Sequence, residues 1–327
     1  MTHDVTVGKY KPFKCHSLHW KRSLDNYADE GKFVVPAVCR LKGSTADYDN
    51  KVVATGLQFL EGTAVQFAAG YDNTNTVRFM GFIKRINFKV PVEVECEGYS
   101  YLLRKKRIPN RTYTNTKLKA ILADIVKDTA ITLSSLIPDI TVTSVQFKDC
   151  NGLDCLDWFK DKMLMTVYFN YSELYVGLRY LGSYGKQIKN QLNWNVIKDD
   201  ELLFETNKEG ATVNMKLVTR LPTGETKTPS PGPTKNGTEK KVKCYGIAPS
   251  DPIFGKIQED LQKKQNIAGY TGRITAFLTP VAELNTVDVI IDNEYNERNG
   301  SYVIEGVEGS FSTSGGRQKI SIGVKLK

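Results

Sequence analysis

The chain has 327 residues, of which 40% are hydrophobic and 25% are charged, and its formal net charge is +9 at pH 7. This composition is typical of a globular protein long enough for two or three domains. It excludes a helical membrane protein, because no apolar run approaches the roughly 18 residues that a membrane span needs. Residues 1–7 lack a basic start followed by an apolar stretch, so no secretory signal is predicted.

In chain order, the sequence predicts two β regions with a smaller α+β region inserted between them. Residues 1–104 consist of short alternating runs separated by Gly, Asn and Asp turns, which is typical of a sandwich or barrel. Residues 105–202 carry the insertion, and residues 203–327 return to the β pattern. We therefore expect a mixed, mainly β fold with two similar β-barrel domains and an inserted small α+β domain.

Within the insertion, helical spacing of apolar residues predicts a helix from Leu118 to Val126, capped by Asn115 or Thr116. A second helix is predicted over 152–164, capped by Asn151 or Asp154. Two strands around a tight Asn-Tyr-Ser turn follow, over 165–171 and 173–178.

The last region is interrupted twice. After a strand at 213–218, residues 221–242 contain four of the chain's twelve prolines and almost no apolar side chains, so they predict a long exposed loop between two strands. Residues 253–266 predict a helix that faces solvent on most sides, and a strand at 270–277 follows.

A hairpin unit occurs twice, about 225 residues apart. Residues 77–83 and 92–98 form the first copy, and residues 301–307 and 319–324 form the second. Each has an apolar run broken by one Gly, a connection, and a strand that alternates polar with β-branched residues. Any two antiparallel hairpins share some of these features, so chance similarity is the alternative to a true repeat.

The second strands of the two copies carry opposite charge. Glu93, Glu95 and Glu97 fall on one face, while the matching strand points Lys319 and Lys325 outward. One interpretation is an ordinary polar outer face. The other is that these five residues face a channel or a partner, and that their opposite charges help the copies alternate around a ring.

The sequence offers no catalytic constellation. The three histidines, His3, His16 and His19, lie close together near the start without a nucleophile motif or an acidic third metal ligand. Asp199-Asp200-Glu201 is interpreted as a solvated turn, and the Gly-rich residues 314–317 as a hairpin turn rather than a phosphate loop. We therefore predict a protein that is not an enzyme and has no cofactor and no metal site.

The cysteines and the basic run do not indicate a site either. The six cysteines have no metal-type spacing and are interpreted as buried free thiols. The run Arg104-Lys105-Lys106-Arg107 is interpreted as a solvated junction between a strand and a helix. A nucleic-acid-binding barrel protein would suit the net charge and stays open as an alternative.

Taken in this order, the chain resembles the baseplate hub proteins of contractile phage tails. This family comprises the late control protein D group, the Mu-type tail hub, and the amino-terminal hub region of type VI secretion spike proteins. The residues that carry the resemblance lie in three segments, at 79–99, 152–177 and 300–320.

The resemblance implies a structural hub with two β-barrels per chain, of which three copies form a ring that joins a sixfold tail tube to a threefold spike. It implies a homotrimer in the virion baseplate, made in the host cytoplasm, with DNA or tape-measure protein passing through its lumen. The chain ends soon after the second predicted barrel, so a separate spike protein is expected on one side and the tube protein on the other. Other baseplate proteins are expected at loop 221–242, and a tail-associated cell-wall hydrolase remains an alternative in this setting.

Overall fold

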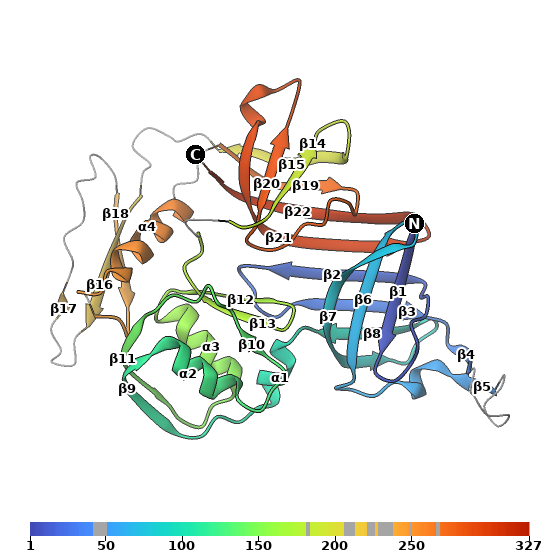
Figure 1. Cartoon of the computed structure of the whole chain (residues 1–327), viewed down its shortest axis with the longest axis horizontal. Helices are drawn as coiled ribbons and strands as arrows, with labels where there is room; N and C mark the ends of the chain where they lie inside the picture. The colour runs from blue at the N-terminus through green and yellow to red at the C-terminus, as the bar shows by residue number, and fades with distance from the viewer. Residues whose placement is uncertain are drawn as a thin grey trace.

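The computed structural model describes residues 1–41, 51–180, 184–205, 213–220, 226–227, 238–248, 250–265 and 269–326. Strands dominate both ends of the described chain, and most of its helices lie in the middle (Figure 1). The predicted mixed, mainly β fold class is confirmed. The division into domains at residues 105 and 203 stays a prediction.

Twelve strands form one large sheet. The six strands of its first half are β1 (Thr2–Val7), β2 (Ser17–Ser23), β3 (Glu30–Val35), β6 (Ala64–Tyr71), β7 (Thr74–Asn87) and β8 (Val92–Glu97). The six strands of its second half are β14 (Gln187–Gln191), β15 (Val196–Glu205), β19 (Gly269–Ala276), β20 (Val287–Ile291), β21 (Gly300–Ser312) and β22 (Gly315–Leu326).

The two halves have the same strand order. The first half runs β1-β6-β7-β8-β3-β2, and the second half runs β14-β20-β21-β22-β19-β15 when its off-path pairing is included. When the strands are numbered from 1 to 6 along the chain within each half, both halves have the order 1-4-5-6-3-2, so equivalent strands have equivalent neighbours. One pairing differs, because β1 is antiparallel to β6 whereas β14 is parallel to β20. The repeated hairpin thus belongs to a repeat of six strands.

A β-bulge occurs at the same place in both halves. The pairing of β7 with β8 shifts register between Ile83 and Arg85, and that of β21 with β22 shifts between Ile304 and Gly306. Ile83 lies opposite Cys96, and Ile304 lies opposite Ile322. Bulges are local, specified features of a sheet, so this match supports an equivalence of the halves from the bulge onward, although β21 has a further shift between Tyr302 and Ile304.

The halves join through β2 and β21, which lie side by side at the centre of Figure 1. They pair antiparallel from Leu18 opposite Phe311 to Ser23 opposite Gly306. Trp20, 1% exposed, lies opposite Gly309, where a Cβ atom would come within 2.0 Å of the indole. Glycine at this position is what lets the two strands approach over a tryptophan.

The core of the first half is formed by side chains at alternate positions of its strands, which point inward. In β8, Val92, Val94 and Cys96 point inward and are buried. Phe33 and Phe67 pack edge to face inside this half, with ring centroids 5.8 Å apart. This core depends on aromatic packing between strands that are distant in sequence.

The inserted region contains the short helices and three small strand pairings. Its elements are α1 (Ser100–Lys105), β9 (Arg111–Lys117), α2 (Leu118–Val126), β10 (Thr132–Leu133), β11 (Thr141–Phe147), α3 (Gly152–Asp161), β12 (Thr166–Asn170) and β13 (Glu173–Gly177). β9 pairs with β11, and β13 pairs with both β10 and β12. The apolar faces of α2 and α3 pack in the same core cluster as strands of the second half.

Both predicted helices form, but only one cap is as predicted. Asn151 accepts hydrogen bonds from the backbone N–H groups of Leu153 and Asp154, while Asp154 accepts one from the Asn151 N–H, which completes a capping box. For α2 the prediction of Asn115 or Thr116 is wrong: the cap position is Lys117, and no side chain caps it. The chain there is still in β9, with Asn115 at φ 47°.

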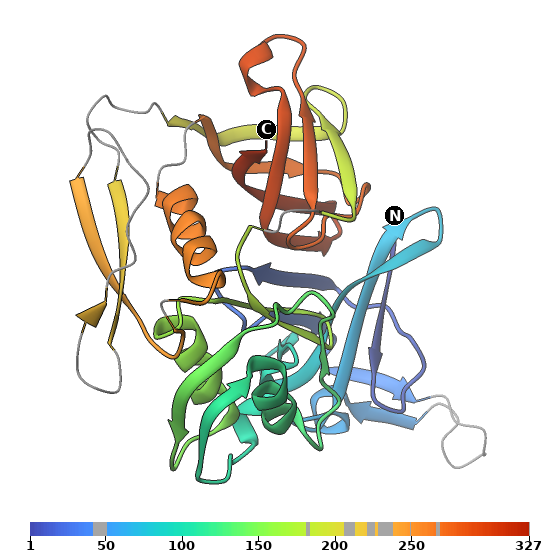
Figure 2. The ribbon, with the colours of Figure 1, turned by 60° about the vertical axis from the view of Figure 1, so that its left-hand side comes forward.

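A separate three-stranded sheet lies beside α4 (Ile253–Gln265), at the left of both Figure 1 and Figure 2. It contains β16 (Val213–Arg220), β17 (Thr226–Lys227) and β18 (Thr238–Cys244). The strand expected at 213–218 thus forms outside the large sheet. The expected loop 221–242 is too long, because β18 starts inside it; residues 221–225 and 228–237 lie outside the described residues.

The remaining elements are short. They are β4 (Val38–Leu41), β5 (Lys51–Ala54), the 3-10 helix η2 (Thr55–Gln58) and the 3-10 helix η3 (Asn296–Arg298). None of the helices in the described ranges combines the length and apolarity needed to cross a bilayer.

Candidate functional site

The acidic strand β8 presents two of its three glutamates at the surface. Glu93 lies 3.3 Å from Lys32 and 3.3 Å from Lys89, and Glu95 lies 2.7 Å from Arg85. Burial alone would raise the pKa of Glu93, but hydrogen bonds from the two lysines lower it. The Arg85 hydrogen bond lowers the pKa of Glu95. Each charge already has a partner within the chain.

Glu97 does not face outward, so its assignment to the same outer face is wrong. It is 2% exposed, because helix α1 starts just after β8 and turns back over the end of the strand. Its carboxylate accepts hydrogen bonds from Ser100 Oγ at 2.8 Å and Arg104 Nη2 at 2.8 Å. Lys84 Nζ lies 3.5 Å away. Glu97 therefore clamps α1 to the sheet, and Arg104 belongs to that clamp rather than to a plain solvated junction.

The two lysines on β22 lie in the other half of the sheet. Lys319 Nζ lies 2.7 Å from Glu201, which also binds Arg273 at 2.9 Å. Lys325 is exposed and donates to the Glu297 carbonyl oxygen at 3.3 Å. The prediction of a solvated turn at Asp199-Asp200-Glu201 is wrong, because these residues lie within β15. The role of Glu93, Glu95, Lys319 and Lys325 toward a channel or partner stays a prediction.

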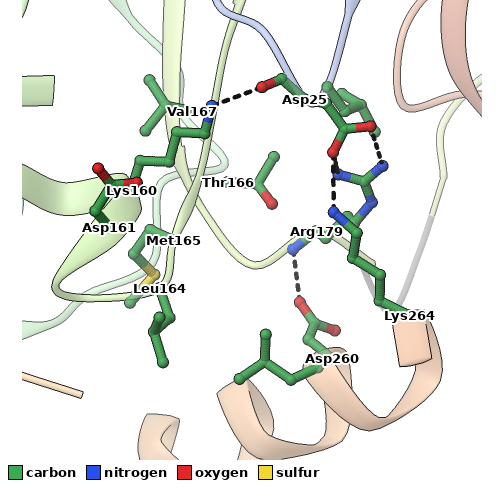
Figure 3. Close-up of a pocket in the computed structure, with 12 residues that line it drawn as sticks. Asp25, Lys160, Asp161, Leu164, Met165, Thr166, Val167, Arg179, Asp260 and Lys264 are labelled. Atoms are coloured by element: carbon green, nitrogen blue, oxygen red, sulfur yellow. Dashed lines mark hydrogen bonds and ion pairs between the residues drawn. The ribbon is translucent and has the colours of Figure 1, made fainter. Parts of the chain in front are cut away.

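A cavity of about 300 Å³ lies where the first half, the inserted region and α4 meet (Figure 3). Asp25 comes from the connection after β2, Lys160 from α3, Arg179 from the chain after β13, and Asp260 and Lys264 from α4. Figure 3 shows Arg179 between Asp25 and Asp260.

Arg179 connects three parts of the chain at this cavity. Its guanidinium binds Asp25 at 2.9 Å and Glu305 of β21 at 2.8 Å, and its backbone N–H donates to Asp260 at 2.6 Å. Lys264 binds the same Asp25 carboxylate at 2.9 Å. Burial alone would lower the pKa of Arg179, but hydrogen bonds and charge from Glu305 and Asp25 raise it.

The two aspartates of this cluster respond in opposite directions. Burial alone would raise the pKa of Asp25, but the charges of Arg179 and Lys264 hold it down at about 2. Burial raises the pKa of Asp260 to about 6, and its two backbone hydrogen bonds only partly offset this. The arrangement holds α4 and the inserted region against the sheet.

Exposed apolar side chains lie at two places on the large sheet, one on its last strand, β15, and one where β7 ends. The β15 edge consists of Trp194 (79% exposed), Ile197 (40%), Leu203 (61%) and Phe204 (55%). The β7 end consists of strand residues 84–87 with the following Phe88 (68% exposed) and Val90 (86%). Neither surface was predicted from the sequence. The apolar triplet 202–204 could have indicated the β15 edge, but the acidic residues just before it led to the interpretation of a solvated turn.

The histidines and cysteines take structural roles. His3 Nε2 accepts from the Cys15 N–H at 2.9 Å, and His19 lies 3.1 Å from Glu308. Cys96, Cys155 and Cys244 are buried as predicted, whereas Cys15, Cys39 and Cys150 are only partly buried; all six are free. Within the described ranges, no three His, Cys, Asp or Glu side chains gather as a metal site would require.

Neither a protein-family model nor a curated protein matches the sequence. Solved structures do match its fold. A tail protein from Neisseria meningitidis aligns with TM-score 0.67 and 12% identity over 99% of this chain and 97% of its own. The 43 kDa tail protein of prophage MuSo2 from Shewanella oneidensis aligns with TM-score 0.63 and 12% identity over 98% and 97%.

A third match comes from a secretion machine. An Escherichia coli component of the type VI secretion system, described as structurally similar to the T4 tail proteins gp27 and gp5, aligns with TM-score 0.61 and 9% identity over 99% of this chain and 77% of its own. At these identities the match concerns the fold. The resemblance drawn from the sequence is confirmed at that level: the chain has the fold shared by phage tail proteins and this type VI secretion component.

Proposed function

We propose that the chain is the structural hub of a phage tail baseplate or a related contractile injection machine. Three copies form a ring that joins a sixfold tail tube to a threefold spike. The observation that carries this proposal is the repeat of six strands, bulge included. Two equivalent units in each of three chains present six similar faces to one partner, while the ring of three chains presents threefold symmetry to the other.

The partners follow from this geometry. The tube protein docks on one side of the ring, a separate spike protein docks on the other, and other baseplate proteins contact the segment 221–242. The lumen passes DNA or tape-measure protein, with Glu93, Glu95, Lys319 and Lys325 as the candidates for channel- or partner-facing residues. The protein resides in the virion, after synthesis in the host cytoplasm.

The chain acts through shape rather than catalysis. Three ion pairs join charged groups at the cavity of Figure 3: Arg179 with Asp25, Arg179 with Glu305, and Lys264 with Asp25. These pairs hold α4 in position and engage the carboxylates of Asp25 and Glu305 in structural contacts.

Native mass spectrometry and electron microscopy of the purified chain test the proposal. We expect a mass of three copies and a ring with six lobes, formed alone or on adding the spike protein. A chain that stays monomeric with the spike would contradict the proposal. Release of cell-wall fragments would instead identify a hydrolase, and DNA affinity that falls steeply with salt would identify a nucleic-acid binder.

A further inference from the structure

The strand pairing that joins the two halves of one chain has an equivalent pairing that the single chain does not make. Within one chain, β2 of the first half pairs antiparallel with β21 of the second half. By strand order, β15 is the counterpart of β2, and β7 is the counterpart of β21. The same contact between β15 and β7 is not made within the chain.

The register of the halves sets which residues correspond. Gly31 lies opposite Cys96 in the first half, and Gly272 lies opposite Ile322 in the second. Trp20 pairs with Gly31, and Leu202 pairs with Gly272, so Leu202 is the counterpart of Trp20.

The matching bulges fix the other strand. Arg85 and Gly306 each follow the register shift, so Ile86 is the counterpart of Val307, and Phe88 is that of Gly309. Pairing with β8 places β7 up to Asn87, and Phe88 is placed by continuing the same register one residue further.

Both strand edges are open among the residues that the structure describes. β15 ends the path of the large sheet and pairs only with β19. In β7, pairing with β6 stops at Phe82, so residues 84–87 have β8 on one side and no strand on the other. Open strand edges invite pairing with another chain unless they are blocked.

We propose that β15 of one copy pairs antiparallel with the β7 end of the next copy, in the register of the β2–β21 junction. Phe204 then lies opposite Ile86, Leu203 opposite Asn87, and Leu202 opposite Phe88. The proposal rests on the hub function above and identifies the surface through which the copies join.

The chemistry of the two surfaces fits this pairing. Phe204 and Phe88 are each more than half exposed in the single chain, and the contact covers them together because they lie on one face of the paired strands. Leu203 lies on the other face, across from Asn87. In the β2–β21 junction the large Trp20 side chain lies opposite a glycine, Gly309, whereas in the proposed contact Leu202 lies opposite the large Phe88.

The contact joins two different surfaces, so it repeats head to tail around a ring. Such interfaces close when their rotation suits the number of copies and otherwise give filaments. Within the chain, the same contact already relates the first half to the second. Repeating it between chains relates every half to the next by the same strand pairing.

Cysteine cross-linking in the full chain tests the register. One chain carries Ile86→Cys and another carries Phe204→Cys, and the two are mixed and oxidised. Paired strands hold opposing Cα atoms about 4.5–5.5 Å apart, within disulfide range. We expect a cross-linked dimer from the mixture and none from either variant alone, from the parent chain with its six native cysteines, or from Ile86→Cys mixed with Lys198→Cys.

A second variant tests the surface without a cross-link. Phe204→Lys places a charge in the proposed contact, and we expect the mass to shift from three copies to one while the circular dichroism spectrum stays that of the folded chain. Leu136→Lys, which alters an equally exposed leucine of the inserted region, should leave the trimer intact.

The outcomes separate this inference from the hub function. A trimer that forms no cross-link at this pair and survives Phe204→Lys overturns the pairing and leaves the hub standing. A chain that stays monomeric with and without the spike protein, and forms no cross-link, overturns both.

Discussion

The guanidinium of Arg179 donates two hydrogen bonds to the carboxylate of Glu305, from Nε at 3.1 Å and from Nη2 at 2.8 Å. Arg179 follows the inserted region, whereas Glu305 lies in the bulge of β21. The pair thus fixes the insertion to the central junction of the sheet. Two parallel hydrogen bonds from a guanidinium to a carboxylate require the two planar groups to lie in one plane. The pair therefore also fixes the orientation of the two side chains.

Loss of the Arg179 side chain should destabilise the protein strongly. Arg179→Ala leaves Glu305, whose side chain is only 16% exposed, without its cation. Breaking a buried pair in this way costs about 3–5 kcal/mol. Urea unfolding measures the loss, and Lys264→Ala is the matched control: it removes a half-exposed cation from the same cluster and should cost less than about 1 kcal/mol. Equal losses in the two variants would refute the central role of Arg179.

The raised pKa of Asp260 predicts a defined pH dependence. In the unfolded chain this carboxyl has its ordinary pKa of about 3.8, whereas in the folded chain its pKa is about 6. Between these values the folded state binds more protons, so this group's contribution to stability falls as the pH rises from about 4 to 6. Asp25, with its pKa lowered to about 2, acts oppositely and loses its contribution only as the pH falls below about 4.

Asp260→Asn should remove that slope. The amide oxygen still accepts from the Arg179 backbone N–H but carries no charge at any pH. We expect the variant to gain about 1–3 kcal/mol relative to the parent on going from pH 4.5 to pH 7.5, as measured by unfolding at both values. An unchanged difference between variant and parent across this range would show that Asp260 titrates normally.

The buried Glu97 and the surface Glu93 should differ in a stability assay although they lie on one strand. Glu97→Ala leaves Ser100 and Arg104 without their acceptor and loosens α1, at a cost of about 1–3 kcal/mol. Glu93→Ala removes only surface ion pairs and should cost less than about 1 kcal/mol. Thermal unfolding of both variants checks this, and a reversed ranking would contradict the buried clamp.

Charge reversal tests the channel- or partner-facing interpretation of β8. The double change Glu93→Lys and Glu95→Lys should impair assembly if these residues face a partner. Native mass spectrometry gives the answer, and oligomers identical to those of the parent would exclude the interpretation. The Glu93→Ala chain serves as the control, because it removes one charge without reversing it.

An added methyl group should destabilise the protein at Gly309, in the central junction, and stabilise it at Gly255, in α4. Gly309→Ala brings a Cβ atom within 2.0 Å of the buried Trp20 indole, and such overpacking costs about 1–3 kcal/mol. Gly255 lies in α4 with nothing within 4 Å of an added Cβ, so Gly255→Ala should stabilise the helix by about 0.5–1 kcal/mol. Chemical denaturation of both variants measures the opposite signs, and equal effects would contradict the tight junction.

Local patterns predicted the local features. The Asn151 cap, the hairpin of β12 and β13, and the alternation of β8 all depend on residues near one another in sequence. Glu97 was misplaced because alternation says nothing of a helix that folds over the strand end. The β15 edge was missed because its exposure depends on which strand lies beside it, and that is decided by pairing between distant segments.

The β2–β21 pairing also sets the order of events during synthesis. Arg22 of β2 finds its partner Val307 only after nearly the whole chain has been made. Until then β2 keeps an unpaired edge beside an almost complete first half, and loop closure over that separation is slow. A chain that stops before β21 therefore keeps the outer edge of β2 unpaired, and an open strand edge of this kind favours aggregation.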